Sequence, residues 1–292
     1  MADIKTEYGK YNVTQIFAHM NLNTECSLVD IAPTISEILH INMVKPHGHV
    51  LNQITEYARE NKTRKVILII VDSLGYALYQ RLTESMPNLQ KIANSGMVFK
   101  CKSPADHTTP AIASIFTGYY PEEHHLYYTD DIYKERAKDE YNPKIKTIME
   151  WGHDSGLKSG IVIESLGAES LAGRIYGTFG IPDSDDIIEY DKKVAENTVK
   201  ALKSNPDIIA VHIRAIDRFA HMSDTWDDIK YSAGSVDENI GTIYSHTRDD
   251  SLFIICGDHP IHSGKKWLEM TGKNDAENYH NRYVALIVGS KK

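Results

Sequence analysis

The stretch Val66-Ile-Leu-Ile-Ile-Val-Asp72 decides the fold of this chain, because six consecutive apolar residues end on a single acid. An apolar run without polar alternation is typical of a strand that is covered on both faces of a sheet. Four further runs of this kind predict strands at 160–163, 207–213, 251–256 and 283–288.

Helical patterns separate these predicted strands. Segments 75–95, 190–203 and 225–245 carry apolar residues at roughly helical spacing. Alternating strands and helices predict an α/β fold, a three-layer sandwich with a mostly parallel central sheet. In such sheets, functional sites gather beyond the carboxyl ends of the strands.

Charge and cysteine content restrict the function. The 292 residues include 32 basic and 40 acidic side chains, a formal net charge of -8, which argues against a nucleic-acid coat protein. A phosphate substrate stays compatible with this charge, because bound metal ions supply local positive charge. Cys26, Cys101 and Cys256 are widely spaced, which argues against a disulfide framework and for a reducing compartment. No apolar run approaches ~18 residues, so we expect no membrane segment and a cytoplasmic location.

Acids and histidines follow three of the predicted strands. Asp72 ends the first, Asp217 and His221 follow run 207–213, and Asp258-His259 comes one glycine after run 251–256. The i,i+4 spacing of Asp217 and His221 would place both on one helix face, where they could bind one ion. Each element alone also fits a capping acid or a surface ion pair. Their conjunction at three strand ends predicts a metal site at one edge of the sheet.

A threonine pair supplies a candidate nucleophile. In Asp106-His-Thr-Thr-Pro110, the proline fits the first turn of a helix, which would place Thr109 near the N-cap and Thr108 just outside it. A hydroxyl there faces free backbone N–H groups and the positive end of the helix dipole, which also favour a phosphate. Ordinary N-capping by threonine is the alternative interpretation.

Taken together, these motifs resemble the alkaline phosphatase superfamily, and most of all its type I phosphodiesterase/nucleotide pyrophosphatase branch. The resemblance extends over about 65–289 and is most specific in Thr108-Thr-Pro-Ala-x5-Thr-Gly-x2-Pro-Glu-x-His124. It implies two metal sites, one of Asp72, Thr108, Asp258 and His259, the other of Asp217, His221 and His280. His262 competes with His280, whose position shortly before the last predicted strand favours it.

The resemblance implies metal-dependent hydrolysis of phosphoric esters through a phospho-threonine intermediate on Thr108, with a small-molecule phosphate ester or nucleotide as substrate. Oxygen and imidazole ligands suit two divalent ions, Zn first, with Mn or Fe as alternatives. Two ions ~4 Å apart can stabilise the attacking and leaving oxygens of an in-line displacement. A phosphodiesterase or nucleotide pyrophosphatase is the primary prediction. A phosphomonoesterase, a phosphonate hydrolase and a non-catalytic metal-binding protein are the alternatives.

Two features bear on the substrate. Thr129 stands where the phosphodiesterase branch has an asparagine that helps to hold the phosphoryl oxygens, which leaves the preference for diesters open. Aromatic side chains are predicted to stack on a base or aryl group, with loop packing as the alternative; they are Tyr127, Tyr128, Tyr133, Tyr176 and Phe179.

The N-terminal segment suggests a permuted chain. Residues 27–51 are similar to a segment that follows the last strand in sulfatase-like and mutase-like members of the superfamily. We therefore predict a circular permutation, with a helix at about 29–40 beside the C-terminal strand. On this hypothesis residues 1–292 form a single catalytic domain, with 61–292 as its core and 1–60 replacing the family's C-terminal segment. A chance amphipathic helix with Pro33 in its first turn is the alternative.

Overall fold

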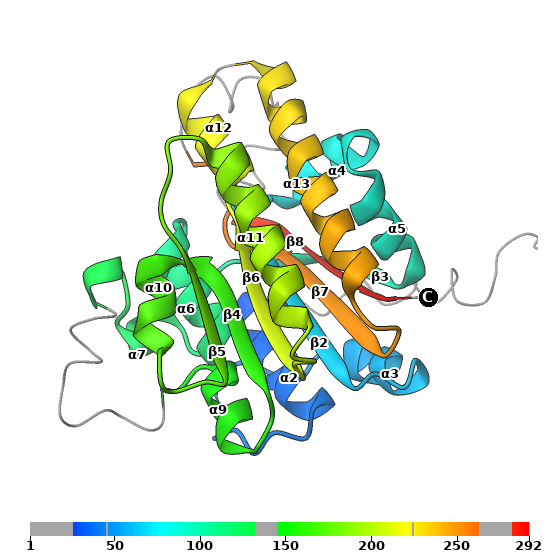
Figure 1. Cartoon of the computed structure of the whole chain (residues 1–292), viewed down its shortest axis with the longest axis vertical. Coiled ribbons are helices and arrows are strands. Elements are labelled where there is room, and N and C mark those ends of the chain that lie inside the picture. The colour runs from blue at the N-terminus through cyan, green and yellow to red at the C-terminus, as the bar shows by residue number, and fades with distance from the viewer. Residues whose placement is uncertain (1–25, 45, 132–144, 224, 263–281, 292) are drawn as a thin grey trace, which may run out of the picture.

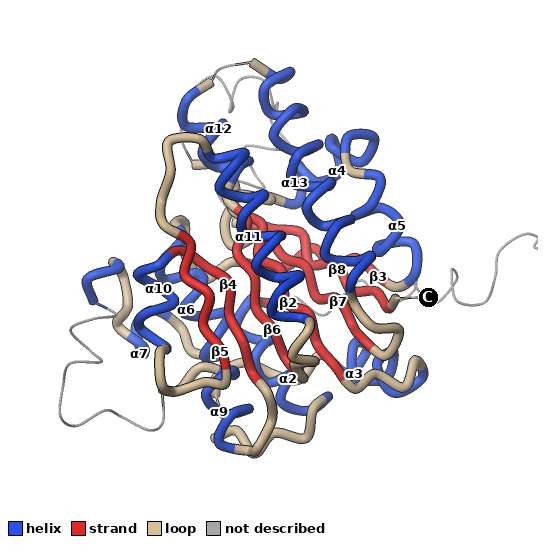
Figure 2. Tube along the Cα trace, viewed as in Figure 1, coloured by secondary structure: helices blue, strands red, loops and turns tan. Residues whose placement is uncertain are grey.

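A single eight-stranded sheet forms the centre of the protein (Figures 1 and 2). The computed structural model describes residues 26–44, 46–131, 145–223, 225–262 and 282–291. The strands are β1 Cys26–Ser27, β2 Lys65–Val71, β3 Met97–Lys102, β4 Ser159–Glu164, β5 Gly177–Ile181, β6 Ile208–Ile213, β7 Ser251–Gly257 and β8 Tyr283–Ser290. Their spatial order is β1-β3-β8-β7-β2-β6-β4-β5, and β8 alone runs antiparallel to its neighbours.

The sheet is buried on both faces because successive side chains of a strand point to opposite sides. In β2, Val66, Leu68 and Ile70 belong to one hydrophobic cluster. The residues between them, Ile67 and Ile69, belong to the other cluster with Val71. A mostly parallel sheet between two apolar cores confirms the predicted three-layer α/β fold.

Helices cover both faces, and Figure 1 shows α11 and α13 crossing one of them. That face packs on α4 Tyr76–Leu82, α5 Pro87–Ser95, α11 Ile187–Leu202, α12 Ala215–Met222 and α13 Trp226–His246. The other face packs on α2 Ile31–Ile38, α3 Asn52–Glu60, α6 Thr108–Thr117, α9 Ile148–Asp154 and α10 Ser165–Leu171. The shorter elements are η1 Leu28–Asp30, η2 Thr83–Ser85 and α7 Pro121–His124. Within the described part of the chain, every helix is too short or too polar to cross a bilayer.

Two details differ from the sequence prediction. The helix predicted at 75–95 is two helices, since Pro87 begins α5 after the short turn η2 and has no N–H with which to continue α4. Three strands were not predicted. β1 has two residues, and β5 reads Gly-Thr-Phe-Gly-Ile. β3 has three half-buried residues followed by two exposed lysines on either side of buried Cys101, so it is not a continuous apolar run.

The N-terminal segment joins the same sheet. β1 pairs with β3, which in turn pairs with β8, the last strand of the chain. The helix predicted at 29–40 is present as η1 and α2, and it shares a hydrophobic cluster with β8 residues such as Leu286. Its main neighbours are α3, α6 and α9 rather than β8 itself. The circular permutation and the single-domain assignment of 1–292 stay predictions.

Candidate active site

The three acid-bearing strand ends meet at one edge of the sheet. Val71 lies in register beside Ile213 on β6 and Gly257 on β7. The residues that follow therefore leave the sheet at the same level, as the parallel arrangement dictates. They deliver Asp72, Asp217 and Asp258, whose side chains are all buried.

Asp72, Asp258 and His259 form one candidate ion site. All three are buried, and each offers a ligand atom within 4.8 Å of the others. Nε2 of His259 lies 3.3 Å from Oδ1 of Asp72 and 3.5 Å from Oδ2 of Asp258. Neither of these carboxylate oxygens has a hydrogen-bond partner in the structure. Because an orphaned buried carboxylate oxygen is costly, this group fits a divalent cation.

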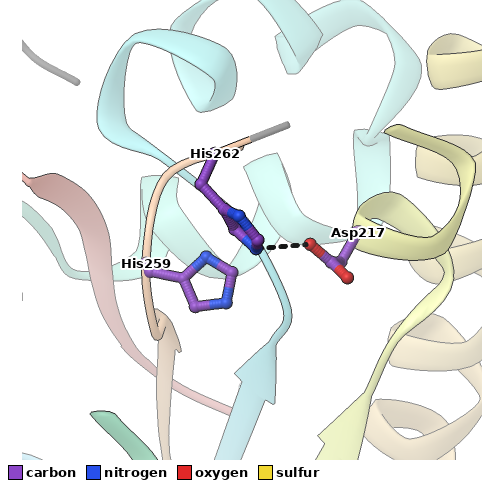
Figure 3. A group of neighbouring side chains, drawn as sticks. All are labelled: Asp217, His259 and His262. Atoms are coloured by element: carbon purple, nitrogen blue, oxygen red, sulfur yellow. Dashed lines mark ion pairs between the residues drawn. The ribbon is translucent and has the colours of Figure 1, made fainter. Parts of the chain in front are cut away.

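Asp217, His259 and His262 form the second candidate group, shown in Figure 3. Nε2 of His262 lies 3.9 Å from Oδ1 of Asp217. On α12, Nε2 of His221 lies 3.3 Å from Oδ2 of the same aspartate, so the two side chains share one helix face, as their i,i+4 spacing predicts. That they bind one ion stays a prediction. The rings of His221 and His262 are 5.0 Å apart. His280, the other candidate ligand, lies outside the described residues.

Thr108 reaches this cluster from α6. Its Oγ1 lies 3.2 Å from Nε2 of His259. The predicted cap was wrong by two residues, because α6 begins at Thr108 and His107 is its N-cap. Pro110 is then the third helical residue, and its missing N–H is among those that have no intrahelical partner in any case. Thr108 thus stands in the first helical turn, where free N–H groups and the helix dipole favour an anion.

Excess negative charge marks the cluster. Burial alone would lower the pKa of His259, but the charges of Asp258 and Asp72 outweigh it and raise this pKa to about 10. Burial and the neighbouring Asp72 raise the pKa of Asp258 to about 6. Burial opposes ionisation of Asp72 as well, yet its contacts with the His212 and His259 imidazoles lower its pKa overall. Bound cations would relieve this repulsion.

Two functional candidates, His212 and Glu164, were not predicted from the sequence. On β6, fully buried His212 places Nε2 3.5 Å from Oδ2 of Asp72 and Nδ1 3.5 Å from Oε2 of Glu164, the last residue of β4. A histidine within the apolar run Ile208–Ile213 was the available signal. Burial opposes its charge, but the two carboxylates raise the pKa of His212 to about 10.

These raised pKa values predict how the ion-free protein responds to pH. The free energy of unfolding should fall as pH rises from about 6.5 to about 10. Stabilisation by His212 and His259 is complete below their ordinary pKa of 6.5 and is lost as pH passes through the folded value.

Urea unfolding of EDTA-treated protein at several pH values measures this slope. His212→Gln is the control, because it removes one of the two histidines and should flatten the decline. A wild-type stability that stays constant or rises over the window would contradict the assigned charges.

The aromatic residues predicted to contact the substrate lie in different parts of the structure. Tyr127 and Tyr128 lie beside the N-terminus of α6, since His107 Nε2 is 3.1 Å from the Tyr127 carbonyl oxygen and the His107 and Tyr128 rings are 6.3 Å apart. The prediction for Tyr176 was wrong, because this residue directly precedes β5 and its ring lies under Lys158, which precedes β4. That is the opposite edge of the sheet.

The prediction that Phe179 stacks on a base or aryl group was also wrong. Phe179 lies in the middle of β5, and its side chain packs against the hydrophobic core. Tyr133 lies outside the described residues. Tyr127 and Tyr128 therefore remain the aromatic candidates beside Thr108.

Several solved structures share this fold. The PH0037 protein from Pyrococcus horikoshii is 17% identical, with a TM-score of 0.52, over 78% of this chain and 86% of that chain. An alkaline phosphatase superfamily protein from Vibrio parahaemolyticus is 13% identical, with a TM-score of 0.53, over 89% of this chain and 68% of that chain. Phosphonoacetate hydrolase from Sinorhizobium meliloti 1021 is 16% identical, with a TM-score of 0.52, over 68% of this chain and 57% of that hydrolase. This chain thus spans less than two thirds of that enzyme.

At these identities the structural likeness shows the fold alone. No curated protein matches the sequence. The family model for type I phosphodiesterase / nucleotide pyrophosphatase, by contrast, matches residues 66–283, a range that holds every candidate site residue named above. The chain therefore belongs to the type I phosphodiesterase / nucleotide pyrophosphatase family.

Proposed function

We propose that this protein hydrolyses phosphate diesters or nucleotide pyrophosphate bonds, with Thr108 as nucleophile and two divalent ions as cofactors. Family membership supports hydrolysis of phosphate esters in general. The observation that carries the finer proposal is the 3.2 Å contact between Oγ1 of Thr108 and Nε2 of His259. This histidine forms candidate ion groups with three buried acids, Asp72, Asp217 and Asp258. An ordinary capping threonine would not need such surroundings.

The donor set fits the ions. Asp72, Asp258 and His259 would hold one ion together with Thr108. Asp217 and His221 would hold the other, completed by His280 or by His262, which lies beside Asp217 in the structure. Carboxylate and imidazole donors suit Zn, and also Mn or Fe. When bound, such ions act as Lewis acids and stabilise the oxygens of an in-line displacement.

The protein's own residues would orient the reaction. The first turn of α6 presents free N–H groups to the phosphoryl oxygens, and the Thr108 hydroxyl stands at the same point. Oγ1 would lose its proton to solvent and attack phosphorus as the bond to the ester oxygen breaks, and the leaving oxygen would take a proton from water. A second water would then cleave the phospho-Thr108 intermediate, which restores the hydroxyl and releases a phosphate monoester. Tyr127 and Tyr128 are the candidates to contact the leaving group. The cytoplasmic location, predicted from the cysteine content and the lack of a long apolar run, stays a prediction.

A paired assay tests the substrate class. Bis-p-nitrophenyl phosphate should be turned over with a kcat/KM at least about tenfold above that of p-nitrophenyl phosphate, a difference of about 1.4 kcal/mol in transition-state binding. Both assays use the same Zn- or Mn-loaded preparation, so that metal content cannot account for the ratio. A ratio in favour of the monoester would contradict the proposal and identify the protein as a phosphomonoesterase. Thr129, which stands where the phosphodiesterase branch has an asparagine, would be compatible with that outcome. Ion binding without turnover of any phosphate ester or phosphonate would favour a non-catalytic metal protein.

A further inference from the structure

Ser73 has an unusual backbone for its position. It follows Asp72 at the end of β2, its φ is 64°, and its side chain is completely buried. Among the described residues other than glycine that have a positive φ, Ser73 is the buried one; the others are His40, Lys62, His125, Asn205 and Arg282. A left-handed conformation costs free energy for a residue with a Cβ and persists where surrounding contacts require it. We therefore looked to its contacts for the reason.

The contacts of Ser73 lead to both candidate ion sites. Its hydroxyl donates to Oδ1 of Asp217 at 2.7 Å. Its backbone N–H donates to Oδ1 of Asp258 at 3.0 Å. Asp217 and Asp258 come from different candidate ion groups and follow different strands, β6 and β7. Ser73 thus ties the two groups together at the end of the strand between them.

The same hydroxyl also fixes the orientation of His259. Ser73 Oγ lies 3.3 Å from Nδ1 of His259, which is also 2.9 Å from the Pro260 carbonyl oxygen. Because the single hydroxyl proton is directed to Asp217, Oγ can only accept from the imidazole. A proton on Nδ1 satisfies both acceptors and leaves Nε2 to face Thr108 and Asp72. Groups that orient a metal-binding histidine in this way typically tune the site.

We propose that Ser73 is a positioning residue that couples the two ion sites, and this rests on the two-ion function proposed above. The hydroxyl holds Asp217, whereas the backbone N–H holds Asp258. Without the hydroxyl, Nδ1 of His259 keeps its second acceptor, the Pro260 carbonyl oxygen. The two tasks can be separated by substitution, because removal of the side chain leaves the N–H in place. Loss of the hydroxyl should therefore weaken the ion held by Asp217 and His221 more than the ion held by Asp72 and Asp258.

Ser73→Gly isolates the hydroxyl. Glycine adopts a positive φ without strain, so the backbone and its bond to Asp258 should persist. Calorimetric titration of Zn into chelated protein should show one of the two ions bound about 10–100-fold less tightly than in wild type, with the other ion within a few-fold. This readout does not depend on catalysis. Ser73→Ala also lacks the hydroxyl but keeps the strained backbone. It should therefore bind ions as Ser73→Gly does, and it should have a lower free energy of unfolding than Ser73→Gly.

Ser232→Ala is the matched control, since that buried hydroxyl donates to the Ile229 carbonyl oxygen inside α13. It should bind both ions as wild type does. If Ser73→Gly binds both ions with wild-type affinity, or weakens both equally, the coupling role is wrong while the two-ion site stands. If wild type itself binds no divalent ion, the proposed function fails and this inference fails with it.

Discussion

Thr108→Ala should lower kcat for any phosphate ester by at least about 10³-fold, the order expected when a covalent nucleophile is removed. The variant should still fold, because Thr108 is only half-buried and alanine is favourable in the first turn of a helix. Its Tm should stay close to that of wild type, and at saturating Zn or Mn it should still load two ions, because Asp72, Asp258 and His259 remain at the first ion. Activity and ion content of the same preparation, measured together, separate loss of the nucleophile from loss of the site.

Two neighbouring substitutions control this prediction. Thr109→Ala makes the same change one position along α6 and should keep most of the activity. Thr108→Ser keeps a hydroxyl and should recover part of it. Wild-type kcat in Thr108→Ala, or an equal loss in Thr109→Ala, would show that the nucleophile is another group.

Removal of divalent ions should have the second large effect. Chelated protein should lose ester hydrolysis by at least about 10³-fold, because without the ions three buried acids would repel the phosphoryl oxygens. It should also be less stable. Asp72 and Asp258 each keep a buried carboxylate oxygen without a hydrogen bond, and an ion present at 100 times its dissociation constant adds about 2.7 kcal/mol by mass action.

Thermal unfolding with and without added Zn or Mn measures this stabilisation. Asp258→Asn is the matched variant, since it keeps the size of the side chain and removes one charged ligand. Its ion-dependent rise in Tm should be much smaller than that of wild type. A wild-type Tm and activity that EDTA leaves unchanged would contradict the metal assignment.

The sequence was most informative where the chain is most buried. β2, β6 and β7 are continuous apolar runs, so their existence and direction followed from burial on both faces. Parallel neighbours must release their acids at one edge, which is why Asp72, Asp217 and Asp258 converge as predicted. The i,i+4 pair on α12 likewise depends on local geometry alone.

The parts of the site that the sequence did not predict depend on tertiary structure. His212 lies inside an apolar run, and only the neighbouring strand ends show that it faces Asp72 and Glu164. The role of Ser73 depends on a positive φ that the local sequence Ser-Leu-Gly does not predict. Tyr176 was misplaced because an aromatic near a predicted loop gives no indication of which edge of the sheet the loop occupies.

Titration of ions into chelated protein, with hydrolysis of bis-p-nitrophenyl phosphate as the readout, tests the central claim most directly. A two-ion site built on Asp72, Asp217 and Asp258 predicts negligible rate without ions and a plateau at two equivalents of Zn or Mn per chain. Full activity in the chelated protein, or no hydrolysis at any ion loading, would contradict it.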